Sequence, residues 1–254
     1  MVTVLRLVRL RTRQPRPSPD AMTLGEHLGE LRRRLVVAVI AFAVAATVSF
    51  IIYPHILNFL KSPYCQVVGA HHCQLYVTGP LDPLTLRIKL AAYGGLFFSS
   101  PVVLWQVWRF ITPGLRRTEK RYALPFVAAS TALFVAGAVV AYVVFSHALQ
   151  FLQSVGGPSL HEIYDPNKYL SLMVALMAVF GLTFEFPVLL VSLELAGVVR
   201  PAKLASWRRW AIVLIVLFAA IITPSSDPFS MLALAVPMYL FYEVSIVLGR
   251  LLRR

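Results

Sequence analysis

Four carboxylates carry most of the chemistry that this chain offers. Glu30 and Glu119 each stand in a short segment rich in arginine and lysine. Glu185 and Glu243 stand inside long apolar runs, where an ionisable residue is costly and is usually functional. A carboxylate can hold a guanidinium through charge-assisted hydrogen bonds, and inside a membrane it can also serve as a proton site. The sequence therefore offers two candidate kinds of site, one on a basic surface and one within apolar surroundings.

Each of these carboxylates also has a purely structural interpretation. Glu30 has the spacing for an i,i+4 pair with Arg34, which contributes about 0.3 to 0.5 kcal/mol in a helix. Glu119 fits an acidic helix start or a local ion pair. Glu185 and Glu243 have no basic residue in a neighbouring turn, and both can extend toward the membrane surface. The residues alone leave these alternatives open.

Six apolar stretches must position these residues. They cover 35–53, 90–107, 122–145, 169–193, 210–222 and 229–248. With 58% hydrophobic and 14% charged residues, a soluble fold would have too little polar surface to cover its core. Most stretches approach the about 20 residues that a bilayer requires. The fifth is shorter, about 18 Å as a helix from 211 to 222, which implies a thinned bilayer or a partner that covers the mismatch.

Basic residues predict the orientation of these spans. Most of the 24 lysine and arginine residues lie in 1–35, 109–121, 200–209 and 250–254, which are every second gap between the apolar stretches. This pattern places both termini in the cytoplasm. The net charge of +13 then reflects topology and attraction to anionic lipid, and no nucleic-acid partner is expected.

The expected domain organisation is simple. Residues 1–21 are basic and interrupted by proline, so they predict a disordered cytoplasmic extension without a cleavable signal peptide. Residues 22–254 predict a single all-α domain of six transmembrane helices. Thr23 and Glu26 have capping-box spacing and leucines recur on one face through Leu35, which predicts an amphipathic helix at the interface before the first span. Prolines interrupt several spans and favour kinked helices in a curved, concave arrangement; they are Pro101, Pro125, Pro187 and Pro237.

The gaps on the opposite side carry two further features. Cys65 and Cys73 are the only cysteines, and both lie in the first extracytoplasmic gap, so a disulfide is expected. The neighbouring His71 and His72 admit a metal site, but the spacing is not a specific ligand pattern and no metal is expected. Asp227, in the turn between the last two spans, fits a turn residue or a helix cap.

Enzymatic motifs are missing from the sequence. It contains no Gly-x-Ser-x-Gly, no His-Glu-x-x-His and no Walker loop. An internal ATPase is therefore not expected, and neither is any other enzyme or a cofactor.

Several of these segments resemble the TatC family, the polytopic subunit of the twin-arginine protein translocase. The matching segments are 27–35, 100–113 followed by Glu119, 184–187, Thr223 and Pro224 with Asp227, and 237–239, in the family's order and spacing. The resemblance covers about residue 22 to the end. It implies a receptor that binds twin-arginine signal peptides of folded precursors. Within an oligomeric complex with TatA- and TatB-like single-span proteins, it would export them across the prokaryotic cytoplasmic (inner) membrane using the proton-motive force.

The resemblance also implies roles for individual residues. Glu30 and Glu119 are the carboxylates that meet the paired arginines, and Pro63 matches a proline of the first extracytoplasmic loop. Other positions that match the signal-peptide site are Arg32, Leu35, Phe110, Pro113 and Leu115. The polar residues expected near partner-helix docking are Glu185, Glu243, Thr223 and Asp227. A planar guanidinium presents parallel donors to a carboxylate, so such a site discriminates against lysine.

A proton-coupled secondary transporter is the alternative function. It would use Glu185 or Glu243 as the coupling site, and an inverted repeat would favour it. The sequence shows no such repeat, since the motifs after the second and fourth spans differ. An intramembrane enzyme would need a catalytic pair facing one cavity, and the sequence has no signature of one.

Overall fold

The computed structural model of the chain describes residues 24–69, 73, 75–77, 79–111, 123–157, 165–195, 197–225 and 227–252, and within these ranges it is helical, with no strand. The helices are α1 (Leu24–Ile51), α2 (Tyr53–Val68), α3 (Asp82–Ile111), α4 (Ala123–Gly156), α5 (Pro166–Phe184), α6 (Phe186–Leu195), α7 (Pro201–Ser206), α8 (Arg208–Ile222) and α9 (Pro228–Leu252). The all-α prediction is confirmed. The predicted extension at 1–21 lies outside the described residues.

Five helical segments are long and apolar enough to cross a membrane. They are Leu28–Ile51, Asp82–Phe110, Leu124–Gly156, Pro166–Leu195, which joins α5 and α6, and Pro228–Leu251. Each overlaps one of the apolar stretches found in the sequence. The remaining stretch forms α8, which has only 15 residues. The short fifth stretch is thus a short helix in the structure.

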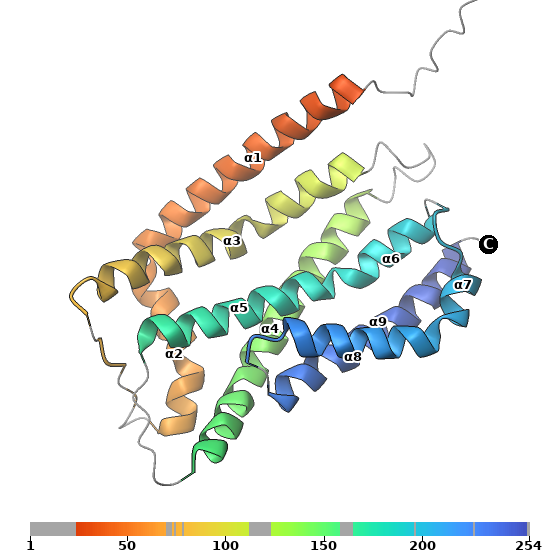
Figure 1. Cartoon of the computed structure of the whole chain (residues 1–254). Helices are drawn as coiled ribbons and strands as arrows, with labels where there is room; N and C mark the ends of the chain where they lie inside the picture. The colour runs from red at the N-terminus through yellow and green to blue at the C-terminus, as the bar shows by residue number, and fades with distance from the viewer. Residues whose placement is uncertain are drawn as a thin grey trace, which may run out of the picture.

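The first helix differs from the prediction. The sequence favoured a separate interfacial helix that turns into the first span, but α1 runs without a break from Leu24 to Ile51 (Figure 1). Between Glu30 and Ile51 there is no proline or glycine, so nothing interrupts its backbone hydrogen bonds. It lies beside α3 at one edge of the molecule, with α8 and α9 at the opposite edge (Figure 1).

Prolines act differently at different positions. Pro101 and Pro237 lie inside continuous helices, α3 and α9. Pro125 lies in the first turn of α4, where proline removes no helical hydrogen bond, so the prediction that it interrupts the span is wrong. Pro187 follows the one break in the fourth stretch, at Glu185 between α5 and α6. Because proline has no backbone N–H, a break beside it is expected.

Two helices begin with the same local signal. Asp165 precedes Pro166 and accepts hydrogen bonds from the backbone of Asn167 and Lys168, at 2.7 and 3.2 Å. Asp227 precedes Pro228 and accepts one from the Ser230 backbone N–H at 2.7 Å. An aspartate cap followed by proline at the first helical position satisfies free N–H groups and presets the helix. The sequence thereby fixes where α5 and α9 begin.

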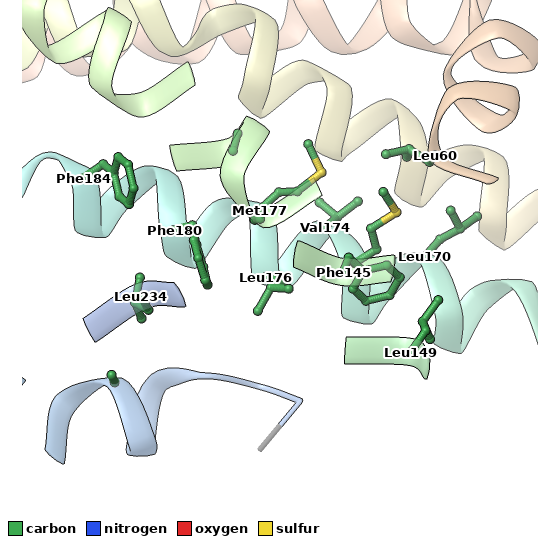
Figure 2. Close-up of a cluster of buried hydrophobic side chains, with 14 of the residues drawn as sticks. Leu60, Phe145, Leu149, Leu170, Val174, Leu176, Met177, Phe180, Phe184 and Leu234 are labelled. Carbon is green, nitrogen blue, oxygen red and sulfur yellow. The ribbon is translucent and has the colours of Figure 1, made fainter. Parts of the chain in front are cut away.

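The core is centred on α5. Its buried residues include Leu170, Met173, Leu176 and Phe180, which meet Phe145 and Leu149 of α4 and Leu234 of α9 (Figure 2). Glycines let α4 and α5 approach closely. A Cβ atom on Gly137 would lie 2.6 Å from the Phe180 carbonyl oxygen, and one on Gly181 would lie 2.8 Å from the Phe134 ring.

Helix α2 is anchored to this core by tyrosines. The Tyr169 hydroxyl donates to the Leu60 carbonyl at 3.0 Å, and the Tyr142 hydroxyl donates to the Phe59 carbonyl at 2.9 Å. Pro63, the residue matched to the family's loop proline, lies inside α2 and is buried. At the end of this helix, Cys65 and Cys73 form a disulfide. His71 and His72 lie outside the described residues.

Candidate functional site

One candidate site is a pocket between the start of α1 and the end of α3. It has a volume of about 230 Å³ and is lined by Glu30, Arg33, Arg34 and Val37 from α1 and by Gln106 and Arg109 from α3. The pocket therefore combines one carboxylate with three guanidinium groups.

Glu30 already has a partner in this pocket. Arg34 donates through Nη2 to Glu30 Oε1, which is the i,i+4 pair that the spacing allowed. The side chains are largely buried, with 22% of Glu30 and 12% of Arg34 exposed. The second carboxylate oxygen, Oε2, is buried and has no hydrogen-bond partner among the described residues. Glu30 thus retains capacity for one more donor.

The other residues predicted for this site fall into two groups. Arg32 and Leu35 are exposed on α1 and do not line the pocket, and Phe110 is half-buried near the end of α3. Glu119, Pro113 and Leu115 lie outside the described residues. The structure adds Gln106 and Arg109, which sequence reasoning missed. Both belong to the 100–113 segment, and their i,i+3 spacing on α3 was an available signal.

A second polar cluster surrounds Glu185. Trp108 Nε1 of α3 donates to Ser130 Oγ of α4 at 2.7 Å, and Ser130 lies close to the Glu185 carboxylate. All three residues are buried, with 7% of Glu185 exposed. The Ser130 hydroxyl accepts from the indole and lies next to the carboxylate, so the cluster brings three helical segments together. Glu185 is therefore buried inside the bundle, which does not support the alternative interpretation that it extends toward the membrane surface.

Glu243 has a basic partner from a distant part of the chain. Arg208 at the start of α8 donates through Nη2 to Glu243 Oε2 at 2.7 Å, and the Tyr239 hydroxyl donates to Oε1 at 3.2 Å. The expectation that Glu243 lacks an internal partner is therefore wrong. The two residues meet because α8 and α9 pack side by side in the tertiary structure, which brings together residues 35 positions apart.

Thr223 and Asp227 occupy the turn between α8 and α9. The Thr223 hydroxyl donates to the Ala219 carbonyl at the end of α8, and Asp227 caps α9. Both side chains are buried, at 2% exposed. Each thus has a local structural role in ending one helix or starting the next.

These features define an all-α membrane protein with several spanning helices and a charged pocket at one helix end. A family model described as Sec-independent protein translocase protein (TatC) matches residues 26–237. The chain belongs to the TatC family. It is accordingly a multi-pass membrane protein of a protein-translocation family rather than an enzyme.

Relatives in three bacteria carry the same family description. The chain is 48% identical to the TatC protein of Frankia casuarinae over 238 residues, which are 90% of this chain and 65% of that protein. For the Corynebacterium kroppenstedtii protein the identity is 36%, covering 94% of this chain and 64% of the relative. This chain thus spans just under two thirds of the length of both relatives. The Aquifex aeolicus protein is 38% identical, covering 92% of this chain and 97% of its own length.

Solved structures agree in fold. A crystal structure of the twin arginine translocase receptor TatC superimposes with a TM-score of 0.73 at 36% identity, covering 90% of this chain and all of that one. A second crystal structure of that receptor, in DDM, gives a TM-score of 0.74 at 37% identity, covering 88% of this chain and 99% of the other.

Proposed function

We propose that this chain is the receptor and core component of a twin-arginine translocase. It binds the twin-arginine signal peptides of folded precursors and, with TatA- and TatB-like subunits in an oligomeric complex, exports them using the proton-motive force. The observation that carries the proposal is the largely buried Glu30 carboxylate, which lies in a pocket between α1 and α3 and has one oxygen without a hydrogen-bond partner among the described residues. Membership of the TatC family supports it and does not favour the secondary-transporter alternative.

The proposed topology has six spans in the cytoplasmic membrane. Helix α8 is the sixth, in addition to the five longer segments, and both termini lie in the cytoplasm. The basic gaps of the sequence support this orientation. The start of α1, the end of α3 and the end of α9 lie toward the upper right in Figure 1, away from α2 at the lower left, which agrees with cytoplasmic termini.

Recognition in this proposal uses two carboxylates for two consecutive arginines. Glu30 meets one guanidinium, and Glu119, in the segment that follows α3, meets the other. A charge-assisted hydrogen bond contributes about 1.5 to 3 kcal/mol, and a guanidinium can form two to one carboxylate. An ammonium lacks the parallel donors, so a twin-lysine peptide binds less tightly. The resemblance to the family assigns Arg32, Leu35, Phe110, Pro113 and Leu115 to the same proposed signal-peptide site.

The test compares signal-peptide cross-linking to Glu30→Ala, Glu119→Ala and the double variant in membrane vesicles. We expect both single variants to insert normally and to lose most of the cross-link to a twin-arginine peptide. The double variant should lose less than the sum if the two carboxylates serve one site. Glu162→Ala, a carboxylate that the charge pattern places on the opposite side, is the control. Wild-type yields from both single variants would contradict the assignment.

Partner docking is proposed on α8 and α9. Helix α8 is short and buries only Ile215 and Ala219, while Trp210, Val213, Leu214, Leu217 and Ile221 are more than half exposed. A hollow of about 200 Å³ beside it is lined by α5, α6, α8 and α9, including Leu182, Phe218 and Met238. A single-span helix packed there would cover the mismatch of a short span. The intramembrane polar residues Glu185, Glu243, Thr223 and Asp227 lie on the elements that frame this surface.

Cysteine scanning from 211 to 248 tests this docking surface. We expect disulfides with a cysteine in a TatA- or TatB-like helix to follow one helical face. One interhelical hydrogen bond contributes only about 0.6 kcal/mol, so apolar packing must supply most of the affinity. Cross-links spread evenly around α8 and α9, or confined to α3 and α4, would place the docking surface elsewhere.

A further inference from the structure

The pair between Arg34 and Glu30 is a contact through one nitrogen and one oxygen. Arg34 Nη2 donates to Glu30 Oε1, whereas Arg34 Nε and Nη1 and Glu30 Oε2 are buried without a hydrogen-bond partner among the described residues. Among the described residues the guanidinium therefore has no second acceptor, and the carboxylate has one oxygen without a donor. A ligand with two parallel donors can form a better pair with Glu30 than Arg34 does.

The surroundings of this pair oppose a cation. Arg33 and Arg109 line the same pocket, and Gln106 is the one uncharged polar residue among the described residues that line it. An incoming cation thus meets two further guanidinium groups near a carboxylate that is already neutralised. Binding of a cationic ligand is favourable only if the ligand displaces Arg34 from Glu30 or forms a strong hydrogen bond with Glu30 Oε2.

We propose that Arg34 is a specificity-determining residue, acting as an internal competitor for the carboxylate that receives the signal-peptide arginine. This inference rests on the proposed function. Because Arg34 is one helical turn from Glu30 in the same helix, it is always present at the site and no ligand meets a free carboxylate. An arginine ligand compensates for the loss of the Arg34–Glu30 ion pair by forming two parallel hydrogen bonds to Glu30. A lysine ligand offers a single point contact and cannot displace the resident guanidinium. Selectivity for arginine over lysine then arises from the cost of displacing Arg34 as well as from the attraction between the ligand and Glu30.

The test measures binding of twin-arginine and twin-lysine signal peptides to the full chain in membrane vesicles. We expect Arg34→Gln to raise twin-lysine binding about fivefold to tenfold and twin-arginine binding about twofold, so the ratio of the two affinities falls several-fold. Arg33→Gln is the matched control. It removes one charge from the same pocket, but Arg33 forms no ion pair with Glu30 in the described structure. Because this change removes a repelling charge from the pocket, it should raise the binding of both peptides by a similar factor and leave the ratio of their affinities unchanged.

Two results would overturn the inference. If Arg34→Gln weakens both peptides, as Glu30→Ala does, Arg34 positions the carboxylate instead of competing for it. If the ratio of affinities is unchanged, or changes equally in Arg33→Gln, the pair does not set specificity. Should Arg34→Gln fail to insert, Arg34→Met removes the competing guanidinium and keeps an unbranched side chain that can pack against its neighbours. It must then give a ratio below that of the wild type, and an equal or higher ratio overturns the inference.

Failure of the proposed function has a different signature. In that case the wild type would bind both peptides equally or not at all, and Glu30→Ala would have no effect. A normal response to Glu30→Ala together with an unchanged ratio in Arg34→Gln would reject the competitor role alone.

Discussion

An ion pair between Arg208 and Glu243 links the start of α8 to the C-terminal half of α9. The guanidinium of Arg208, at the start of α8, donates to the carboxylate of Glu243 on α9 at 2.7 Å. The other end of α8 leads through the turn at Thr223 directly into α9. Both ends of α8 are therefore fixed to α9, although α8 itself buries few side chains. The proposed docking surface thus has a defined position even with one helix largely exposed.

The first prediction concerns this ion pair. Glu243→Gln should lower the thermal stability of the detergent-purified protein slightly at low ionic strength and not at high ionic strength. The reason is that 47% of the Arg208 side chain and 27% of the Glu243 side chain are exposed, so salt screens the attraction. The measurement is the melting temperature at two salt concentrations. Arg208→Gln should have the same effect as Glu243→Gln. Arg209→Gln, which removes the adjacent exposed charge, is the control for Arg208→Gln. An equal drop in melting temperature at both salt concentrations would contradict an ion pair that is screened by salt.

A second prediction concerns Cys65 and Cys73. In the mature protein both thiols should resist alkylation without reductant, because the proposed topology places the disulfide on the side away from cytoplasmic reductants. Replacing both by serine should lower the free energy of unfolding by about 2 to 3 kcal/mol, the range expected for closing a loop this short. Mass spectrometry after alkylation checks the first claim, and denaturant unfolding checks the second. Full labelling of both thiols in intact cells would refute the bridge.

The close approach of α4 and α5 gives a third prediction. Gly137→Ala should destabilise the protein by about 1 to 3 kcal/mol, the usual cost of overpacking. The new methyl group would lie 2.6 Å from the Phe180 backbone oxygen, which cannot move aside as a side-chain end can. Gly25→Ala is the control, since nothing lies within 4 Å of that position. Melting temperatures of both variants check the prediction, and equal losses would show that helix packing is not the cause.

The sequence predicted those features that depend on local patterns. Apolar length predicted the short α8, and the proline next to Asp227 fits the cap that starts α9. It did not predict contacts that depend on how helices cross. Arg208 meets Glu243 from 35 positions away, and Trp108 meets Ser130 from 22. Hydrophobic periodicity identifies the buried face of a helix but does not specify which neighbour that face will meet.

The candidate site shows the same difference between features set by local sequence and contacts set by helix packing. The pair of Glu30 with Arg34 was predictable, because both residues lie on one helix at i,i+4 spacing. The opposite wall of the pocket, Gln106 and Arg109, was not, because it depends on α3 ending beside the start of α1. The position of Glu119 relative to Glu30 stays a prediction.

The last prediction concerns Ser130, which connects Trp108 to Glu185. Ser130→Ala removes the acceptor of the indole N–H and the hydroxyl that lies next to the Glu185 carboxylate. Each buried polar group left without a partner costs about 1 to 3 kcal/mol, so the loss of stability should exceed that of one ordinary hydrogen bond. Ser146→Ala is the matched control, because its hydroxyl donates only to the Val143 carbonyl of its own helix and is exposed. The two variants should therefore differ by at least 1 kcal/mol in denaturant unfolding. Ser130→Thr, which keeps the hydroxyl, should recover part of the loss. If Ser130→Ala is no less stable than Ser146→Ala, then α3, α4 and α5 are held by apolar packing alone, and Glu185 does not depend on Ser130 for its position.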